Sequence, residues 1–193
     1  MAVELKKGQK VNLVKKGSSV GEILINLNWD KPKKRFLFTP KAIDLDLGCL
    51  FELKDGRKGS VQALGKAFGS LQNPPYIALD GDDRTGESEG GENLRVNGAK
   101  ISEIKRILVY TFIYEGAANW QEAKGVVTLR YPGSEDLIVR LDEYDYRKMC
   151  AIALLENNDG ESFTVQKLVR YFAGHRPMDE EYHWGLHWVA GSK

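Results

Sequence analysis

Apolar and polar residues alternate along several short stretches of the chain, a pattern typical of β-strands that bury one face. From Gly21 to Trp29, apolar side chains occupy every second position from Ile23 onward. The same alternation runs from Ala42 to Leu53. It predicts one face with Ile43, Leu45, Leu47, Cys49 and Phe51, and an opposite face with Asp44, Asp46, Gly48 and Leu50.

A third stretch, Arg106 to Tyr114, is continuously apolar and rich in β-branched and aromatic residues, so it predicts a central strand buried on both faces. Asp55-Gly56 predicts a tight turn, and residues 59–79 are expected to be irregular up to a short strand at Tyr76–Leu79. The remaining expected strands are Val11–Val14, Leu94–Val96, and two pairs, Val126–Tyr131 with Leu137–Leu141 and Cys150–Glu156 with Phe163–Tyr171.

Helical patterns are few. Ala117–Lys124 is expected to form one short segment, and Met178–Val189 is the tail segment expected to be helical, with its aromatic residues docked on the sheets. Many short strands with turns every ten or so residues favour an all-β fold, a β-sandwich of two mainly antiparallel sheets with short helices, one near the C-terminus. Without a repeat or linker, residues 1–193 are interpreted as a single domain.

Composition narrows the functional classes. The 193 residues have a net charge of +1, which argues against a dedicated nucleic-acid binder. The start of the chain has no hydrophobic signal region and no apolar run is long enough to span a membrane, so a soluble, cytoplasmic protein is expected. The basic stretch 31–35 is interpreted as a solvated surface, with contact to anionic lipid or an acidic partner left open.

The strongest chemical feature is an acidic stretch from Asp80 to Glu92, which holds six carboxylates, one arginine and four glycines. Carboxylates this close repel one another unless the loop is fully solvated or a cation lies among them. Calcium accepts several oxygen ligands in irregular loops. The spacing does not match an EF-hand, and a solvated acidic loop remains the alternative.

Asp44 and Asp46 are two residues apart on one expected strand, so both carboxylates project from the same face. Asp30, directly after Trp29, is a third acid at a strand end. If the acidic stretch packs across these strand ends, one or two calcium ions would lie among Asp44, Asp46, Asp82, Asp83 and Glu92. The alternative is that Asp44 and Asp46 face solvent or pair with lysines.

Other candidates have less support. His183 and His187 would lie one helical turn apart, a spacing that can hold zinc, although the metalloprotease motif is absent. Cys49 and Cys150 lie in apolar stretches and are interpreted as buried free thiols rather than a disulfide or a nucleophile.

Three motifs together resemble the TerD-type domain of the tellurium-resistance proteins: Asp44-Leu45-Asp46, Asn28-Trp29-Asp30, and residues 81–87 (Gly-Asp-Asp-Arg-Thr-Gly-Glu). The opening Leu5–Leu13 is also similar to the start of that family, and residues 44–53, 69–86 and 106–120 most resemble its TerA branch. The resemblance implies a β-sandwich with calcium sites built from the two acidic motifs, a role in tellurite and stress resistance, and no established enzymatic activity.

Carried over residue by residue, the resemblance implies metal ligands at Asp44, Asp46, Asp82, Asp83 and Glu87. The chain departs from the family pattern where Ser88 replaces a glycine and where residues 90–93 are shorter and poorer in acids, so Glu92 aligns only if a residue is deleted. Fewer acids predict weaker calcium binding, down to one site or none.

The sequence therefore predicts a calcium-binding, non-enzymatic stress-response module that interacts with other tellurium-resistance-type proteins or with itself. Two alternatives remain: a metal-free scaffold of the same fold that assembles with related subunits, and a metal-assisted hydrolase, which lacks a visible general base.

Overall fold

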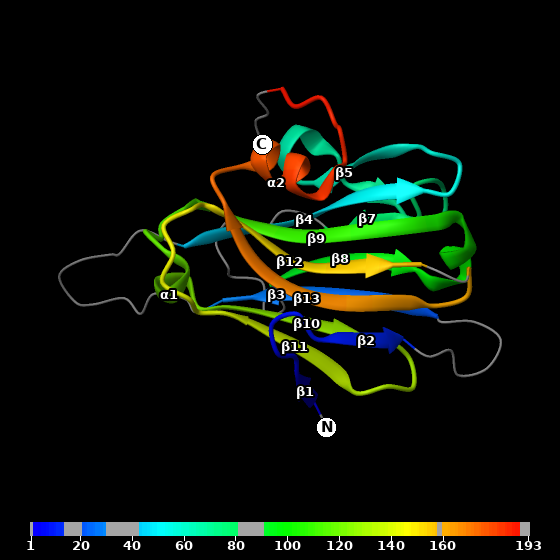
Figure 1. Ribbon diagram of the computed structural model, residues 1–193, viewed down its shortest axis with the longest axis horizontal. Helices are drawn as coiled ribbons and strands as arrows, with labels where there is room; N and C mark the ends of the chain where they lie inside the picture. The colour runs from blue at the N-terminus through cyan, green and yellow to red at the C-terminus, as the bar shows by residue number, and fades with distance from the viewer. Residues whose placement is uncertain (1, 14–20, 30–42, 81–90, 158–159, 190–193) are drawn as a thin grey trace.

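Two β-sheets pack face to face in the computed structural model, which describes residues 2–13, 21–29, 43–80, 91–157 and 160–189 (Figure 1). The seven-stranded sheet contains, in spatial order, β1 (Ala2–Glu4), β11 (Asp136–Leu141), β10 (Gly125–Arg130), β3 (Glu22–Asn28), β8 (Glu92–Asn97), β7 (Ile77–Leu79) and β6 (Gly69–Ser70). Its neighbouring strands are antiparallel except β1 and β11, which run parallel.

The six-stranded sheet is antiparallel throughout. Its spatial order is β2 (Lys10–Leu13), β13 (Phe163–Phe172), β12 (Met149–Glu156), β9 (Ile104–Glu115), β4 (Asp44–Leu53) and β5 (Lys58–Gln62). The predicted β-sandwich is thus confirmed, as are the predicted pairs β10–β11 and β12–β13. The short helices are η1 (Leu64–Lys66), η2 (Gly98–Glu103), α1 (Trp120–Ala123) and α2 (His175–Tyr182).

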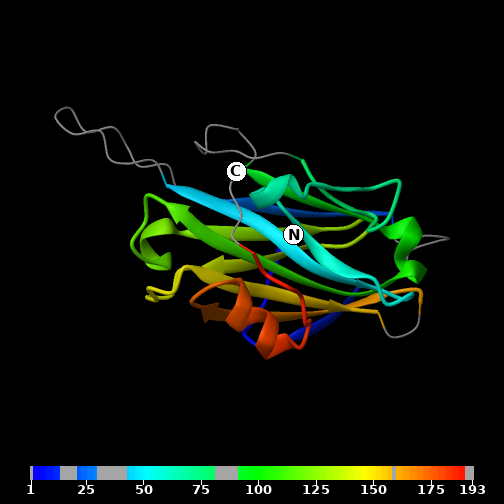
Figure 2. The same ribbon diagram turned by 90° about the horizontal axis from the view of Figure 1, so that it is seen from above.

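The main core lies between the sheets, where alternating residues of each strand meet, including Ile25 of β3, Leu47 of β4 and Val109 of β9. A second apolar cluster covers the outer face of the six-stranded sheet. There Leu50, Tyr110 and Met149 pack against Met178 of α2 and Trp184 of the following segment. Figure 2 shows α2 and that segment, in orange and red, lying along this face. Covering both faces explains why the middle of β9 is continuously apolar.

One sequence prediction was wrong in part, within residues 59–79, and one strand at the start of the chain was missed. The stretch expected to be irregular contains β5 and β6, and β1 was not predicted at all. β5 (Lys-Gly-Ser-Val-Gln) has little strand propensity of its own, and it is held by pairing with β4 from Gly48 to Glu52. Pairing across a turn outweighs weak local propensity here.

The prediction of a helix over Met178–Val189 was right only for its first part, because α2 begins earlier, at His175, and covers Met178–Tyr182 alone of the predicted range. The helix α2 ends at Tyr182, and His183 adopts a left-handed conformation with φ of 56°. The buried carboxylate of Asp179 accepts hydrogen bonds from the backbone N–H groups of Gly185 and Leu186, which folds the chain away from the helix axis. His183 and His187 therefore do not share one helical face, and the zinc spacing that depended on a helix is lost. The predicted docking of the tail is confirmed, because Trp184 is buried and Trp188 packs on the same cluster.

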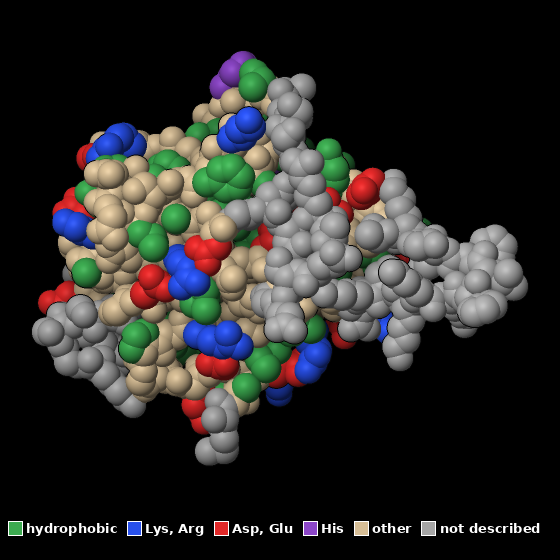
Figure 3. Space-filling view, turned by 180° about the vertical axis from the view of Figure 1, so that it is seen from behind, with side chains coloured by type: hydrophobic (Ala, Val, Ile, Leu, Met, Phe, Trp, Pro, Cys, Tyr) green, Lys and Arg blue, Asp and Glu red, His purple; other side chains and the backbone are tan. Residues whose placement is uncertain are grey.

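The outer face of the seven-stranded sheet carries mixed charges. Figure 3 shows blue and red side chains interspersed over the described part of this face. They include the ion pairs Arg95–Asp80, Arg95–Glu22, Arg130–Asp136 and Arg140–Glu4.

The basic stretch 31–35 lies outside the described residues. In the part of the chain that is described, no helix has the length and apolar character needed to cross a membrane.

Candidate metal centre

The first strand of the candidate site is β4, whose alternation directs Leu45, Leu47 and Cys49 into the core between the sheets. Asp44 and Asp46 project from the opposite face of this strand, as predicted. Both are nevertheless buried, with exposed fractions of 2% and 0%. The alternative in which these two carboxylates face solvent is therefore wrong, because β4 is covered on both of its faces.

Glu92 reaches this strand from the other sheet. It is the first residue of β8, it is 2% exposed, and its Oε2 accepts a hydrogen bond of 2.6 Å from the backbone N–H of Leu47. β5 pairs with β4 only from Gly48 to Glu52, so the edge of β4 beyond Gly48 is open to a side chain from the facing sheet. Glu92, the last acid of the acidic stretch, thus contacts Leu47, the residue directly after Asp46.

The described residues that flank segments 30–42 and 81–90 lie at this same end of the sandwich. Trp29 Nε1 donates to the carbonyl of Ile43 at 2.9 Å, which joins the end of β3 to the start of β4. The N–H of Asp80 donates to the carbonyl of Asn93 at 2.9 Å, which brings the two flanks of residues 81–90 together. The first contact joins the two sheets, and the second joins two chain segments within the seven-stranded sheet.

Gly91 fixes the path of the chain into β8. Its φ is +66°, and a Cβ atom added there would lie 2.1 Å from the carbonyl oxygen of Leu27. Only glycine allows the backbone to pass this close to β3 in that conformation. The approach sets where the side chain of Glu92 enters the core.

Of the predicted ligands that the structure describes, Asp44, Asp46 and Glu92 are each buried, and Glu92 bonds to the backbone of Leu47, the residue after Asp46. Asp30, Asp82, Asp83 and Glu87 lie outside the described residues. Asp80, at the other end of the acidic stretch, pairs with Arg95 on the outer face of the seven-stranded sheet. Within the described ranges, no three His, Cys, Asp or Glu side chains are arranged to hold a metal ion.

Sequence reasoning missed that Tyr110 is buried beside Asp46 on the outer face of β4, where its hydroxyl donates to Gln62. The ring of Tyr110 packs on Gly48, where an added Cβ would lie 2.8 Å from the ring. Burial raises the pKa of Tyr110 well above its usual value, and the nearby Cys49 and Asp46 raise it further. Gly48 was the available signal, because a glycine inside a strand often marks the close approach of another group.

The two cysteines are free and buried, as predicted. Burial raises the pKa of the Cys49 thiol to about 12 and that of Cys150 above its usual range. Both thiols are protonated at neutral pH, which disfavours them as nucleophiles.

Comparison with known proteins decides the family. The TerD domain matches residues 1–136 of the chain. The chain belongs to the TerD domain family. It is 45% identical over 190 residues to the Tellurium resistance protein TerA of an Alcaligenes species, a match that covers 95% of this chain and 56% of that protein. It is 31% identical over 125 residues to the uncharacterized protein YceE of Bacillus subtilis (strain 168), covering 63% of this chain and 62% of YceE.

This TerD-family chain therefore spans little more than half the length of the two curated relatives. Two crystal structures share its fold. The protein SAV2460, of unknown function, superposes with a TM-score of 0.61 at 16% identity, covering 84% of this chain and 95% of that one. SCO6318 of Streptomyces coelicolor A3(2), a homologue of the resistance protein TerD, superposes with a TM-score of 0.60 at 18% identity, covering 83% and 95%. The resemblance seen in the sequence motifs is confirmed.

Proposed function

We propose that this chain is a calcium-binding, non-enzymatic module that acts in tellurite resistance and the stress response by mediating protein interactions in the cytoplasm. Its membership of the TerD family and its 45% identity to a protein named for tellurium resistance support the resistance role. Its partners would be other tellurium-resistance-type proteins or a second copy of the chain.

The observation that carries the calcium part of the proposal is the contact between Glu92 and Leu47. Through it, the end of the second acidic motif meets the strand that carries the first. Asp44, Asp46 and Glu92 offer only carboxylate oxygens, and these are the hard donors that calcium prefers. The other proposed ligands, Asp30, Asp82, Asp83 and Glu87, belong to residues 30–42 and 81–90, which adjoin the β4 and β8 strands in sequence.

When bound, calcium would supply positive charge among these carboxylates and stabilise the folded state in proportion to its excess over Kd. The role of the chain's own residues is to hold the two motifs together. Glu92 ties β8 to β4, and the Trp29–Ile43 hydrogen bond ties β3 to β4. The end of the sandwich ordered in this way would present the surface for a partner protein.

The test is a series of thermal melts and calorimetric titrations of the full chain with excess calcium, excess magnesium or a chelator. At a hundredfold excess over Kd, calcium should add about 2.7 kcal/mol, which is roughly 5–10 °C for a chain of this size. Asp44→Asn/Asp46→Asn should lose the shift, whereas Asp55→Asn, in an exposed turn, should keep it. Equal melting temperatures in calcium and chelator would remove the metal from the proposal.

A metal-free scaffold of the same fold is the second candidate. It is favoured by the finding that the described residues hold no ready three-ligand metal site and that Glu92 is already engaged with Leu47. Light scattering of the full chain at several concentrations separates the two candidates. Self-association that is identical in calcium and in chelator supports the scaffold, whereas association that requires calcium supports the metal-dependent module.

A further inference from the structure

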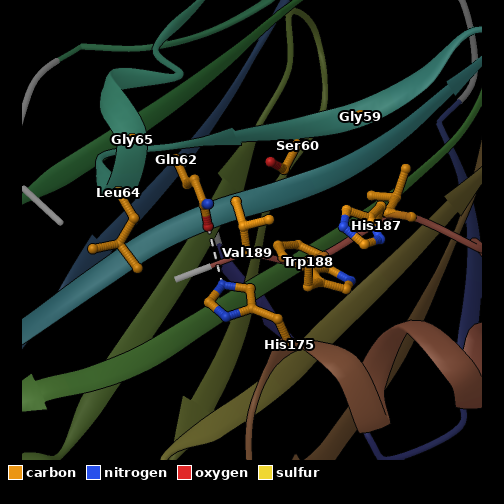
Figure 4. A pocket seen from close by; sticks show the side chains of 10 residues that line it. Gly59, Ser60, Gln62, Leu64, Gly65, His175, His187, Trp188 and Val189 are labelled. Atoms are coloured by element: carbon orange, nitrogen blue, oxygen red, sulfur yellow. Dashed lines mark hydrogen bonds between the residues drawn. The ribbon is translucent and has the colours of Figure 1, made fainter. Parts of the chain in front are cut away.

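A pocket of about 440 Å³ opens on the outer face of the six-stranded sheet, between β5 and the segment that follows α2 (Figure 4). Its volume falls within the range of small-molecule sites in proteins. Ser60 and Gln62 reach it from β5, His175 from α2, and His187 and Trp188 from the segment after the helix. Nothing in the family comparison or in the calcium proposal depends on this pocket.

The floor of the pocket is a fixed polar group. The side chain of Gln62 is only 9% exposed, and its Oε1 accepts a hydrogen bond of 2.6 Å from the hydroxyl of Tyr110. The same oxygen lies 3.0 Å from Nε2 of His175. Burial lowers the pKa of His175 to about 4, so the imidazole is neutral at physiological pH and donates through Nε2. Two donors on Oε1 fix the orientation of the amide and leave the NH₂ group of Gln62 to donate to a ligand.

One wall of the pocket is the indole of Trp188, which is fixed by its contacts with His175 and Asp179. The indole of Trp188 stacks on His175, with ring centroids 4.6 Å apart and planes inclined by 33°. Its Nε1 donates to Asp179 at 3.0 Å, so the polar atom of the indole is already bonded within the protein. Asp179 also accepts from Gly185 and Leu186, which fixes the chain that carries Trp188. A wall that is already ordered lowers the entropic cost of binding a ligand.

The lining of the pocket offers few charged partners for an ion. Among the described residues that line it, none is Asp, Glu, Lys or Arg. A charged ligand would give up hydration here without gaining an ion pair, which is costly. The hydroxyl of Ser60 lies two residues along β5 from Gln62, and Figure 4 shows both side chains on the same side of the strand. The pocket thus offers an amide donor, a hydroxyl and an aromatic wall.

We propose that this pocket binds a small, uncharged, planar ligand of the aromatic amide class. Its carbonyl oxygen accepts hydrogen bonds from the Gln62 amide and the Ser60 hydroxyl, and its ring lies against Trp188. Leu64 and Val189 supply apolar contacts at the sides. Unlike the acidic residues of the metal centre, these groups recognise shape and hydrogen bonding rather than charge.

Benzamide is the probe that tests the proposal, titrated into the isotopically labelled full chain and followed by nuclear magnetic resonance. Saturable shifts should be centred on the side-chain NH₂ of Gln62 and the indole N–H of Trp188, with a Kd in the millimolar range or tighter for a ligand of this size. Benzoate and benzylamine match benzamide in size but carry charge, and each should bind at least about tenfold more weakly. Equal binding of the three probes, or shifts centred elsewhere, would overturn the proposal.

Variants give the second readout. Gln62→Glu keeps the oxygen that faces Tyr110 and His175 but removes the NH₂ donor, so it should weaken benzamide binding at least about tenfold. Ser60→Ala, at a half-buried position, should weaken binding about threefold or more, whereas Thr128→Ala on β10 of the other sheet should leave Kd unchanged. If Gln62→Glu fails to fold, Ser60→Ala decides, and an unchanged Kd in that variant contradicts the proposal.

Discussion

Glu92 belongs to the seven-stranded sheet, yet its carboxylate holds the backbone N–H of Leu47 in the six-stranded sheet at 2.6 Å. Contacts between the layers of a sandwich are mostly apolar, because side chains of the two inner faces interdigitate there. A carboxyl acceptor in this position is buried and is kept in place by a strand edge that β5 does not reach. This contact makes Glu92 a structural residue whether or not calcium binds.

Removing that acceptor should destabilise the fold. Glu92→Ala leaves the buried N–H of Leu47 without its acceptor and should lower the free energy of unfolding by about 1–3 kcal/mol. Glu92→Gln keeps an acceptor oxygen and should lose less. Urea unfolding in the presence of a chelator measures this without any contribution from metal. Equal losses in the two variants would mean that the charge of Glu92 matters rather than its hydrogen bond.

Gly48 should resist substitution because Tyr110 occupies the space above it. A Cβ at this position would lie 2.8 Å from the ring of Tyr110, which is buried and held by the hydrogen bond that its hydroxyl donates to Gln62. We expect Gly48→Ala to destabilise the protein by about 1–3 kcal/mol through overpacking. The comparison variant is Gly174→Ala, where an added Cβ meets nothing within 4 Å; because Gly174 is the N-cap of α2, where Ala is less favourable than Gly, a loss below about 1 kcal/mol is expected. Thermal melts of both variants check the difference, and equal stabilities would contradict the packing argument.

The success of the sequence predictions follows from how local each signal is. Alternation along β4 placed Asp44 and Asp46 on one face, because the period of a strand is a property of the strand itself. The burial of those acids could not be predicted in the same way, since it depends on what packs over the outer face. The Glu92–Leu47 contact was equally inaccessible, because it requires knowing where β5 stops.

The end of the predicted tail helix also depended on a contact that the local sequence pattern does not reveal. The residues of Met178–Val189 have an apolar pattern compatible with a helix, but the helix stops where the side chain of Asp179 captures two backbone N–H groups. Asp179 is the second residue of the expected helix, and an acid in a first turn normally favours a helix, so it gives no local signal of this role. The aromatic content of the tail did predict that it would dock on the sheet.

Asp179 should therefore control the order of the tail. Asp179→Ala removes the acceptor for Gly185, Leu186 and the indole of Trp188, and we expect a loss of about 2–4 kcal/mol in unfolding free energy. Amide hydrogen exchange should accelerate first at Gly185 and Leu186, ahead of the strands. Glu180→Ala, at an exposed neighbouring position, serves as the control. Unchanged protection of those two amides in Asp179→Ala would contradict the role assigned to this carboxylate.

His175 should make the protein less stable in acid. Its pKa is about 4 in the folded protein because the ring is buried, whereas an unfolded chain has the ordinary value of 6.5. Between these two values the unfolded state binds more protons, so stability is fully present above pH 6.5 and is lost as the pH falls toward 4. The difference corresponds to roughly 3 kcal/mol.

His175→Phe cannot take up that proton and keeps an aromatic ring against Trp188. We expect wild type to lose roughly 2–3 kcal/mol more than this variant between pH 7.5 and pH 4.5, measured by urea unfolding at each pH. The carboxylates titrate in both proteins, so they cancel in the comparison. Parallel pH profiles for the two proteins would show that His175 titrates near its ordinary value and that the ring is more solvated than its contacts with Gln62 and Trp188 indicate.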